Sequence, residues 1–130
     1  MIRRLQPGAR LSGAVVHGNT VYLAGQVADD PSLDAEGQAR DILRQIDALL
    51  AEAGTNKAHL LHVQIFLADM ADFPAMNRAW DEWLDRANPP ARATVQAPLA
   101  DPAWLVEMTG IAALPDQPQV GLSGWESRLA

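Results

Sequence analysis

The first part of the chain carries a hairpin pattern followed by a helix pattern. β-Branched and other apolar residues at positions 14–24 flank the dipeptide Gly18-Asn19, which predicts two strands joined by a tight turn. Gly25 follows the second strand directly and marks a place where the backbone turns or is closely approached. From Asp34 to Ala53, apolar residues recur at three- and four-residue spacing, which predicts a helix with one buried face.

The middle of the chain predicts a buried strand and a second helix. Leu60 to Ala68 is largely apolar on both faces, as in a strand that is covered on both sides. Asp72 is expected to cap a helix that tolerates Pro74 in its first turn. The expected buried stripe of this helix comprises Met76, Trp80, Trp83 and Leu84.

Two further strands are predicted after this helix, from Arg92 to Leu99 and from Trp104 to Ala113. The order of elements predicts one α+β domain over residues 1–115, with both helices packed on one face of a mixed sheet. The opposite face is also apolar and no third helix is available, so another copy of the protein is expected to cover it. Residues 116–130 are expected to form a C-terminal tail.

Composition narrows the possible functions. The chain has 130 residues, a net charge of −6 and no cysteine, which excludes disulfides, thiolate nucleophiles and cysteine-based zinc sites. Its ten basic residues are scattered, which disfavours general nucleic-acid binding but leaves a local RNA contact open. The N-terminal residues do not resemble a signal peptide, and no apolar stretch reaches the roughly 18 residues that span a bilayer. We therefore expect a cytoplasmic protein.

Arg92 and Glu107 are the candidates for chemistry. Arg92 begins a strand after a double proline, and a guanidinium offers a rigid fork of donors that matches a carboxylate. Glu107 is a single carboxylate within an apolar strand, where an unpartnered charge is unfavourable, so it is paired, protonated or at a cavity. The alternatives are a surface arginine in a strand-entry loop, and a structural ion pair or a water-facing edge position for Glu107.

The distance between these two residues depends on how their strands pair. If the two strands form a hairpin around residues 100–102, the possible registers leave Glu107 several residues along from Arg92 or on the other face. The separation is then roughly 7–13 Å, which disfavours a direct ion pair. A site that uses both residues is easier to build in a cleft between two subunits.

Other residue types give weaker indications. His59 and His62 lie at a strand entry without acidic or sulfur ligands at metal-site spacing, so we expect packing or surface roles and no metal site. Trp80 and Trp83 fit the core stripe of a helix better than a base-stacking surface.

Three segments together resemble the RidA/YjgF/L-PSP family. Residues 18–26, which read GNTVYLAGQ, resemble the family's GN hairpin. Residues 90–95, which read PARATV, resemble its "P-x-R-x-x-V" segment, and Leu105-Val106-Glu107-Met108 resembles its "VEI" strand. The spacing from Arg92 to Glu107 also fits, and the match covers about residues 1–115.

The resemblance implies a chorismate-mutase-like α+β fold and a homotrimer with ligand clefts between subunits. Its best-known members hydrolyse enamines and imines to 2-keto acids and ammonia without a cofactor. By this resemblance Arg92 clamps the substrate carboxylate and Glu107 positions or activates water. Backbone groups around Gly25 and Ala93 help to hold the ligand, and Asn77 lies near a position where many members carry a functional asparagine.

The chain departs from the pattern of the deaminating members at three positions. Ala24 stands where those members usually carry serine, Thr94 where they usually carry cysteine, and Leu11 where they often carry tyrosine. These changes keep the clamp and the base but alter the pocket walls. We therefore expect a divergent member that acts on a small imino acid. The alternatives are a non-catalytic binder of a carboxylate-bearing metabolite and, less favoured, an endoribonuclease.

Overall fold

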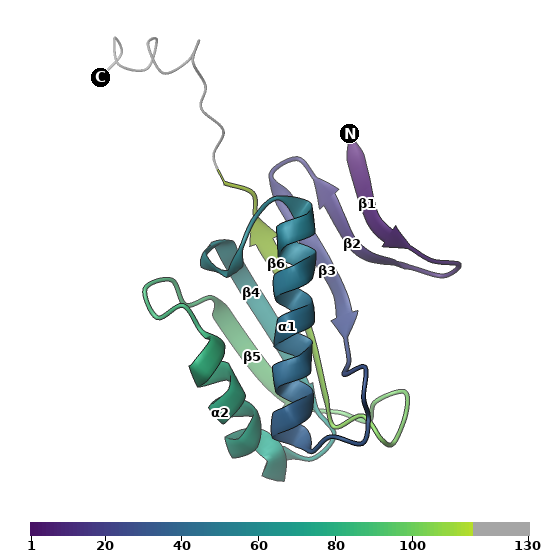
Figure 1. Ribbon diagram of the computed structural model, residues 1–130, viewed down its shortest axis with the longest axis vertical. Helices are drawn as coiled ribbons and strands as arrows, with labels where there is room; N and C mark the ends of the chain where they lie inside the picture. The colour runs from purple at the N-terminus through teal and green to yellow at the C-terminus, as the bar shows by residue number, and fades with distance from the viewer. Residues whose placement is uncertain (116–130) are drawn as a thin grey trace.

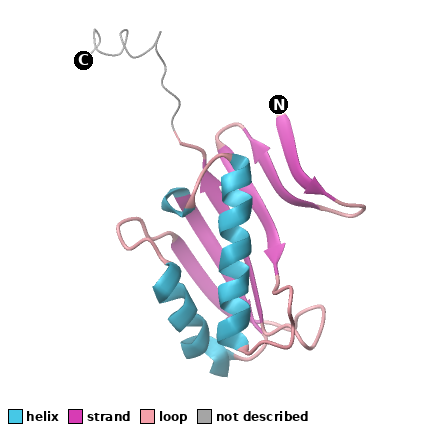
Figure 2. Cartoon of the chain, viewed as in Figure 1, coloured by secondary structure: helices cyan, strands magenta, loops and turns pink. Residues whose placement is uncertain are grey.

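The computed structural model describes residues 1–115, which form a single sheet with helices on one side (Figures 1 and 2). The elements are β1 (Ile2–Pro7), β2 (Ser12–His17), β3 (Thr20–Gln26), α1 (Ala35–Ala53), β4 (Leu60–Leu67), α2 (Phe73–Trp83), β5 (Ala91–Gln96) and β6 (Val106–Ala113), with short 3₁₀ turns at Lys57–His59 and Met70–Asp72. The predicted tail, residues 116–130, lies outside the described residues.

The six strands form one mixed sheet in the order β1-β2-β3-β6-β4-β5. β4 and β5 run parallel, and every other neighbouring pair is antiparallel. Figure 1 shows α1 crossing the sheet and α2 lying beside β5, both on the same face. The predicted α+β fold, a mixed sheet with two helices on one face, is confirmed.

Local sequence signals explain where the helices begin and end. The Asp34 side chain accepts a hydrogen bond from the Gly37 N–H, and Gly54 ends α1 with a left-handed φ of 96°. The prediction for α2 is wrong in one detail, because Asp72 stands at its N-cap but makes no capping hydrogen bond. Asp69 instead accepts a hydrogen bond within the preceding 3₁₀ turn. Leu84 is the C-cap residue of α2, and both Leu84 and Trp83 are only partly buried against the core.

The strands differ from the sequence analysis in two respects. β5 and β6 do not form a hairpin, because both pair with β4, which lies between them. β6 buries Val106 and Met108 under the helices and therefore occupies a central place in the sheet. β1 was not predicted, because this edge strand is mostly exposed and shows no clear alternation of apolar and polar residues.

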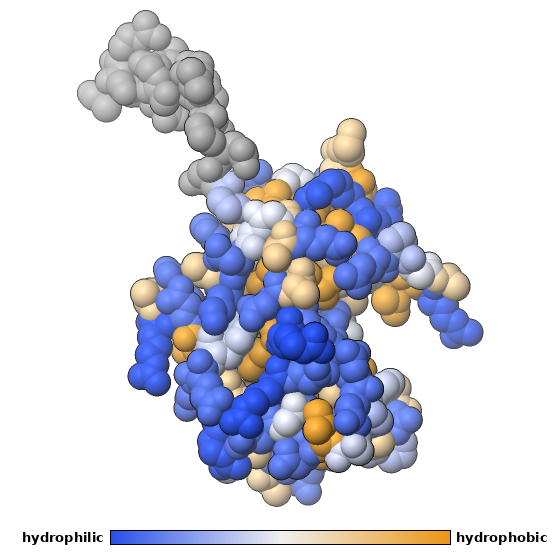
Figure 3. Space-filling view, in the orientation of Figure 1, coloured by the Kyte–Doolittle hydropathy of each residue, from blue (hydrophilic) through white to orange (hydrophobic). Residues whose placement is uncertain are grey.

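The sheet face away from the helices is uncovered in the described part of the chain. Tyr22 of β3 is 46% exposed and Val95 of β5 is 44% exposed on this face. The helix side presents a mostly hydrophilic surface instead (Figure 3). The expectation that another copy of the protein covers this face stays a prediction. No helix within residues 1–115 is long and apolar enough to cross a membrane.

Candidate functional site

Arg92 lies on the helix face of β5, at the free edge of the sheet. Its partner on β4 is the buried Val63, so the two side chains share the face that carries α2. The guanidinium carbon of Arg92 lies 5.0 Å from the centre of the Trp80 ring and 5.8 Å from that of Phe73. Among residues 1–115 no carboxylate forms an ion pair with Arg92. Its guanidinium is therefore held by aromatic rings rather than by a counter-ion.

The charge of Arg92 persists despite partial burial. Burial lowers the pKa of the Arg92 guanidinium, and the nearby Asp81 carboxylate opposes that change. Arginine stays protonated in proteins because its ordinary pKa is so high. Arg92 is thus a positive group without an ion-pair partner in the described chain, which is the property needed to bind an external anion.

Thr94 and Asn77 lie on the same side of the sheet as Arg92. Thr94 follows Arg92 by two residues on β5 and therefore points to the same face. Its hydroxyl oxygen is buried and has no hydrogen-bond partner within residues 1–115. Asn77 stands four residues after Phe73 and three before Trp80, which places it on the same stripe of α2 as both rings. Thr94 and Asn77 therefore share the helix side of the sheet with Arg92, and their part in a ligand site stays a prediction.

Glu107 lies on the opposite, uncovered face. It is paired in register with Phe66 of β4, while its neighbours Val106 and Met108 point into the core. A methyl group built on Gly25 would overlap Oε2 of Glu107 and lie 3.1 Å from its Cδ atom. Gly25 falls in the register irregularity between Leu23 and Gln26, where β3 departs from regular pairing with β6. Because Gly25 has no side chain, the Glu107 carboxylate can occupy the space beside it.

The Glu107 carboxylate has no partner in the described part of the chain. No hydrogen bond or ion pair of its side chain occurs within residues 1–115. The alternative of a structural ion pair for Glu107 is therefore not realised there. A half-buried carboxylate that lacks a counter-ion is suited to hold water or a cationic ligand group.

The remaining candidates lie close to one or the other of these groups. Ala24 directly precedes Gly25, and its carbonyl accepts a hydrogen bond of 3.0 Å from the Gln26 side chain. Ala93 separates Arg92 from Thr94, and its carbonyl accepts one from Gln64. Leu11 directly precedes β2 and is 66% exposed. The start of β2 lies beside the end of β3.

Arg92 and Glu107 do not meet within one copy of the chain. Arg92 shares a face with Val63, and Glu107 shares one with Phe66, which lies three residues further along β4. Side chains an odd number of residues apart on a strand point to opposite faces. The two charged residues are thus separated both by β4 and by the sheet itself. The geometry divides the candidates into a helix-face group at the β5 edge and an open-face group at the end of β3.

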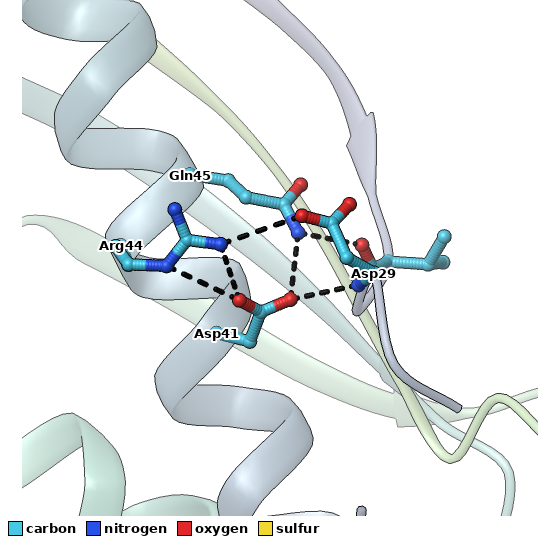
Figure 4. A network of polar contacts seen from close by, with 5 residues as sticks. Asp29, Asp41, Arg44 and Gln45 are labelled. Carbon is cyan, nitrogen blue, oxygen red and sulfur yellow. Dashed lines mark hydrogen bonds and ion pairs between the residues drawn. The ribbon is translucent and has the colours of Figure 1, made fainter. Parts of the chain in front are cut away.

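The segment after Gly25 is fixed by polar side chains of α1 that the sequence analysis did not identify. The Asp29 N–H donates to Oδ2 of Asp41 over 2.7 Å, and the Gln45 amide donates to the Val27 carbonyl over 2.9 Å (Figure 4). Arg44 pairs with both Asp41 and Asp29. These contacts hold the loop that follows β3 against α1.

The ionisation of Asp41 fits this role. Burial raises the pKa of the Asp41 carboxyl, but hydrogen bonds from Arg44, from the Asp29 N–H and from Gln45 outweigh it, so the pKa lies below its ordinary value. Asp41 therefore remains an acceptor at neutral pH.

Two aromatic residues beside Arg92 were missed by the sequence analysis, which assigned Trp80 only to packing and gave Phe73 no role. Trp80 is buried as predicted, but it also contacts Arg92, as does Phe73. The spacing of Phe73, Asn77 and Trp80 along one stripe of a helix was the available signal. Its relation to Arg92 required knowledge of which strand lies beside α2. Elsewhere in residues 1–115, no three His, Asp or Glu side chains gather as a metal site requires.

Comparisons with known proteins agree over nearly the whole described chain. Residues 1–114 match the endoribonuclease L-PSP family. A RutC family protein of Haemophilus influenzae is 51% identical over 112 residues, a match that covers 85% of this chain and 97% of the relative. The RutC family protein YoaB of Escherichia coli is 45% identical and covers 87% of this chain and 98% of its own.

Solved structures give the same result. A member of the YjgF protein family from Neisseria meningitidis has a TM-score of 0.87 at 41% identity and covers 90% of this chain and 98% of its own. An uncharacterized protein from Pseudomonas aeruginosa has a TM-score of 0.86 at 43% identity and covers 88% of this chain and all of its own. The chain therefore belongs to the endoribonuclease L-PSP family, whose members are also named RutC and YjgF proteins.

Proposed function

We propose that the protein hydrolyses a small reactive imino acid to a 2-keto acid and ammonia, without a cofactor. The observation that carries this proposal is the presence of two charged residues, Arg92 and Glu107, that have no ion-pair partner within residues 1–115. A cation that binds a carboxylate and a carboxylate that holds water are the two groups this reaction needs. The family resemblance assigns the same two roles.

Imine hydrolysis requires that the protein orient the substrate and the water molecule more than that it activate the substrate. The carbon of a protonated imine is already electrophilic, so a positioned water molecule and a base are sufficient. The oxygen of water forms a bond to that carbon while Glu107 accepts one proton of the water. Glu107 then returns this proton to the nitrogen, the C–N bond breaks as the hydroxyl oxygen forms the carbonyl, and the hydroxyl proton leaves with ammonia as ammonium. Arg92 holds the substrate carboxylate with two parallel hydrogen bonds. Thr94, Asn77 and the backbone at Ala93 and Gly25 complete the ligand contacts.

The site is proposed to form between two copies of the chain. Arg92 lies at the free β5 edge and Glu107 on the open face, so an edge of one copy placed against the open face of the next would bring the two groups together. The same contact would cover the exposed apolar side chains of that face. A closed ring of three copies satisfies both requirements and leaves no open end.

We therefore expect a homotrimer in solution. Light scattering coupled to size exclusion should give a mass three times that of the chain at micromolar concentration. A monomer under these conditions would contradict the site between subunits as well as the trimer. A cytoplasmic location remains a prediction of the composition.

Imine hydrolysis can be tested directly. An amino-acid oxidase generates a panel of imino acids in situ, and semicarbazide traps the imine that has not been hydrolysed. We expect the wild-type protein to lower the trapped signal for at least one imino acid, and the substrate with the largest decrease defines the substrate class. An unchanged signal across the panel would rule out the hydrolase for these substrates.

A non-catalytic metabolite binder is the second candidate. The observation in its favour is Ala24, which offers no hydroxyl directly before Gly25 in the chain. This hypothesis predicts tight carboxylate binding without turnover. An endoribonuclease is less favoured, because the net charge is −6 and the proposed site has no histidine acid–base pair. RNA cleavage that persists through purification and disappears in Glu107→Gln would restore that candidate.

The substitution Gly25→Ala should reduce turnover more than stability. The new methyl group meets only the flexible end of Glu107, so the carboxylate can rotate away while the fold is kept. We expect kcat/KM to fall by about tenfold or more and the free energy of unfolding to change by about 1 kcal/mol or less. Imine turnover and urea unfolding measure the two effects.

Gly110→Ala provides the contrast. A methyl group there would lie 2.9 Å from the backbone carbonyl oxygen of His62, which cannot move without displacing β4. We expect this variant to lose mainly stability. If Gly25→Ala retained full turnover, the position of the Glu107 carboxylate against Gly25 would not be required for catalysis.

A further inference from the structure

The Arg92 side chain is ordered by aromatic contacts. A long arginine side chain loses about 2 kcal/mol of rotamer entropy when it is fixed in one orientation. Carboxylates usually fix it, but none within residues 1–115 forms an ion pair with Arg92. What lies against the guanidinium is the Trp80 ring at 5.0 Å and the Phe73 ring at 5.8 Å. The orientation of Arg92 thus depends on two residues of α2.

These rings are well placed to act as a fixed support. Trp80 is only 5% exposed and belongs to the hydrophobic core, so its ring has little freedom to move. Phe73 packs against the same core at the start of α2. A guanidinium that meets an aromatic ring keeps its N–H groups directed outward in its own plane. That plane carries the donor pairs that match a carboxylate.

We propose that Trp80 and Phe73 are positioning residues that hold the Arg92 guanidinium in the orientation with which it binds the substrate carboxylate. The inference rests on the proposed carboxylate-binding role of Arg92 and adds the residues that prepare it. Preorganised donors bind more tightly because less freedom is lost when the ligand arrives. The rings act through Arg92 and are not themselves in contact with the reacting atoms.

The expected kinetic result is a change in binding and not in chemistry. A group that binds the substrate and the transition state equally well affects KM and leaves kcat unchanged. We expect Trp80→Leu to raise KM for the best imino acid by about tenfold, with kcat within about twofold of the wild type. The dissociation constant of 2-ketobutyrate, a stable product-like carboxylate, should rise by about the same factor in calorimetry.

Trp83→Leu is the matched control. Trp83 lies on the same helix, 5.5 Å from Trp80, but its indole N–H donates to Asp47 and its ring lies under Lys57. This variant removes a tryptophan of the same size and leaves Arg92 on its support. We expect its KM to stay within about twofold of the wild type. Trp80→Phe, which keeps a ring beneath the guanidinium, should recover most of the lost affinity.

Two arrangements keep the test decisive. Should Trp80→Leu fail to fold, Phe73→Leu at a half-buried position tests the same support, and we expect a KM increase of several-fold. Should the wild type hydrolyse no imino acid, the proposed function fails, and 2-ketobutyrate binding still tests the positioning. The inference is overturned if Trp80→Leu and Trp83→Leu weaken binding equally, if neither weakens it, or if the wild type binds no carboxylate.

Discussion

Replacing Arg92 with alanine is expected to reduce kcat/KM for imine hydrolysis by about 10²- to 10³-fold, because the loss of a charge-assisted pair with the substrate carboxylate corresponds to about 3–4 kcal/mol. The stability of the subunit should change little, since Arg92 makes no ion pair within residues 1–115 and loses only its contacts with the rings. Initial rates with in situ imines, together with urea unfolding, separate the two effects.

The control variants for Arg92 distinguish charge from geometry. Arg92→Lys keeps the positive charge but loses the planar fork and its stacking, so it should recover only part of the activity. Arg4→Ala removes an exposed arginine from β1, at the other edge of the sheet, and should leave activity unchanged. Turnover by Arg92→Ala within threefold of the wild type would show that Arg92 does not bind the substrate.

Replacing Gln38 with leucine is expected to destabilise the protein by about 3 kcal/mol or more, because buried polar groups lose their partners. Gln38 is fully buried on α1, and the two hydrogens of its amide nitrogen are shared among three backbone carbonyls, those of Pro31, Leu33 and Ala103. Its side-chain oxygen accepts the Leu105 N–H over 2.8 Å. The residue thus joins the loop before α1 to the loop that leads into β6, two residues before Glu107.

Urea unfolding at a fixed protein concentration measures this loss, because the stability of an oligomer depends on concentration. Gln45→Leu is the comparison, since Gln45 lies on the same helix and is only partly buried. We expect it to lower the free energy of unfolding by about 1 kcal/mol. Equal decreases in the free energy of unfolding of both variants would mean that the buried hydrogen bonds of Gln38 stabilise the protein no more than those of Gln45.

Much of the local structure could be read from the sequence. The helix from Ala35 to Ala53 follows from its apolar spacing and from the caps Asp34 and Gly54, all of which act between neighbours in the chain. The hairpin of β2 and β3 follows from the Gly18-Asn19 turn. The failure at Asp72 is also local, because the 3₁₀ turn capped by Asp69 runs directly into α2.

The pairing of distant strands could not be read in the same way. β5 and β6 are neighbours in sequence, so a hairpin was the simplest expectation, but β6 inserts between β3 and β4. Burial decides this order: a strand with buried Val106 and Met108 belongs in the centre, whereas β5, with Arg92 and exposed Val95, belongs at an edge. The order of the strands depends on how buried each strand is relative to the others, and this cannot be read from one segment alone.

The sequence by itself determined both helices, every strand except β1, the fold class and the two candidate charged residues. Periodicity, caps and a carboxylate in an apolar strand are properties of short segments. Only the tertiary structure decided that Arg92 and Glu107 lie on opposite faces, that Phe73 and Trp80 support the guanidinium, and that Gly25 makes room for the carboxylate. These relations depend on which strands pair and in which register, and a shift of one residue would send each side chain to the other face.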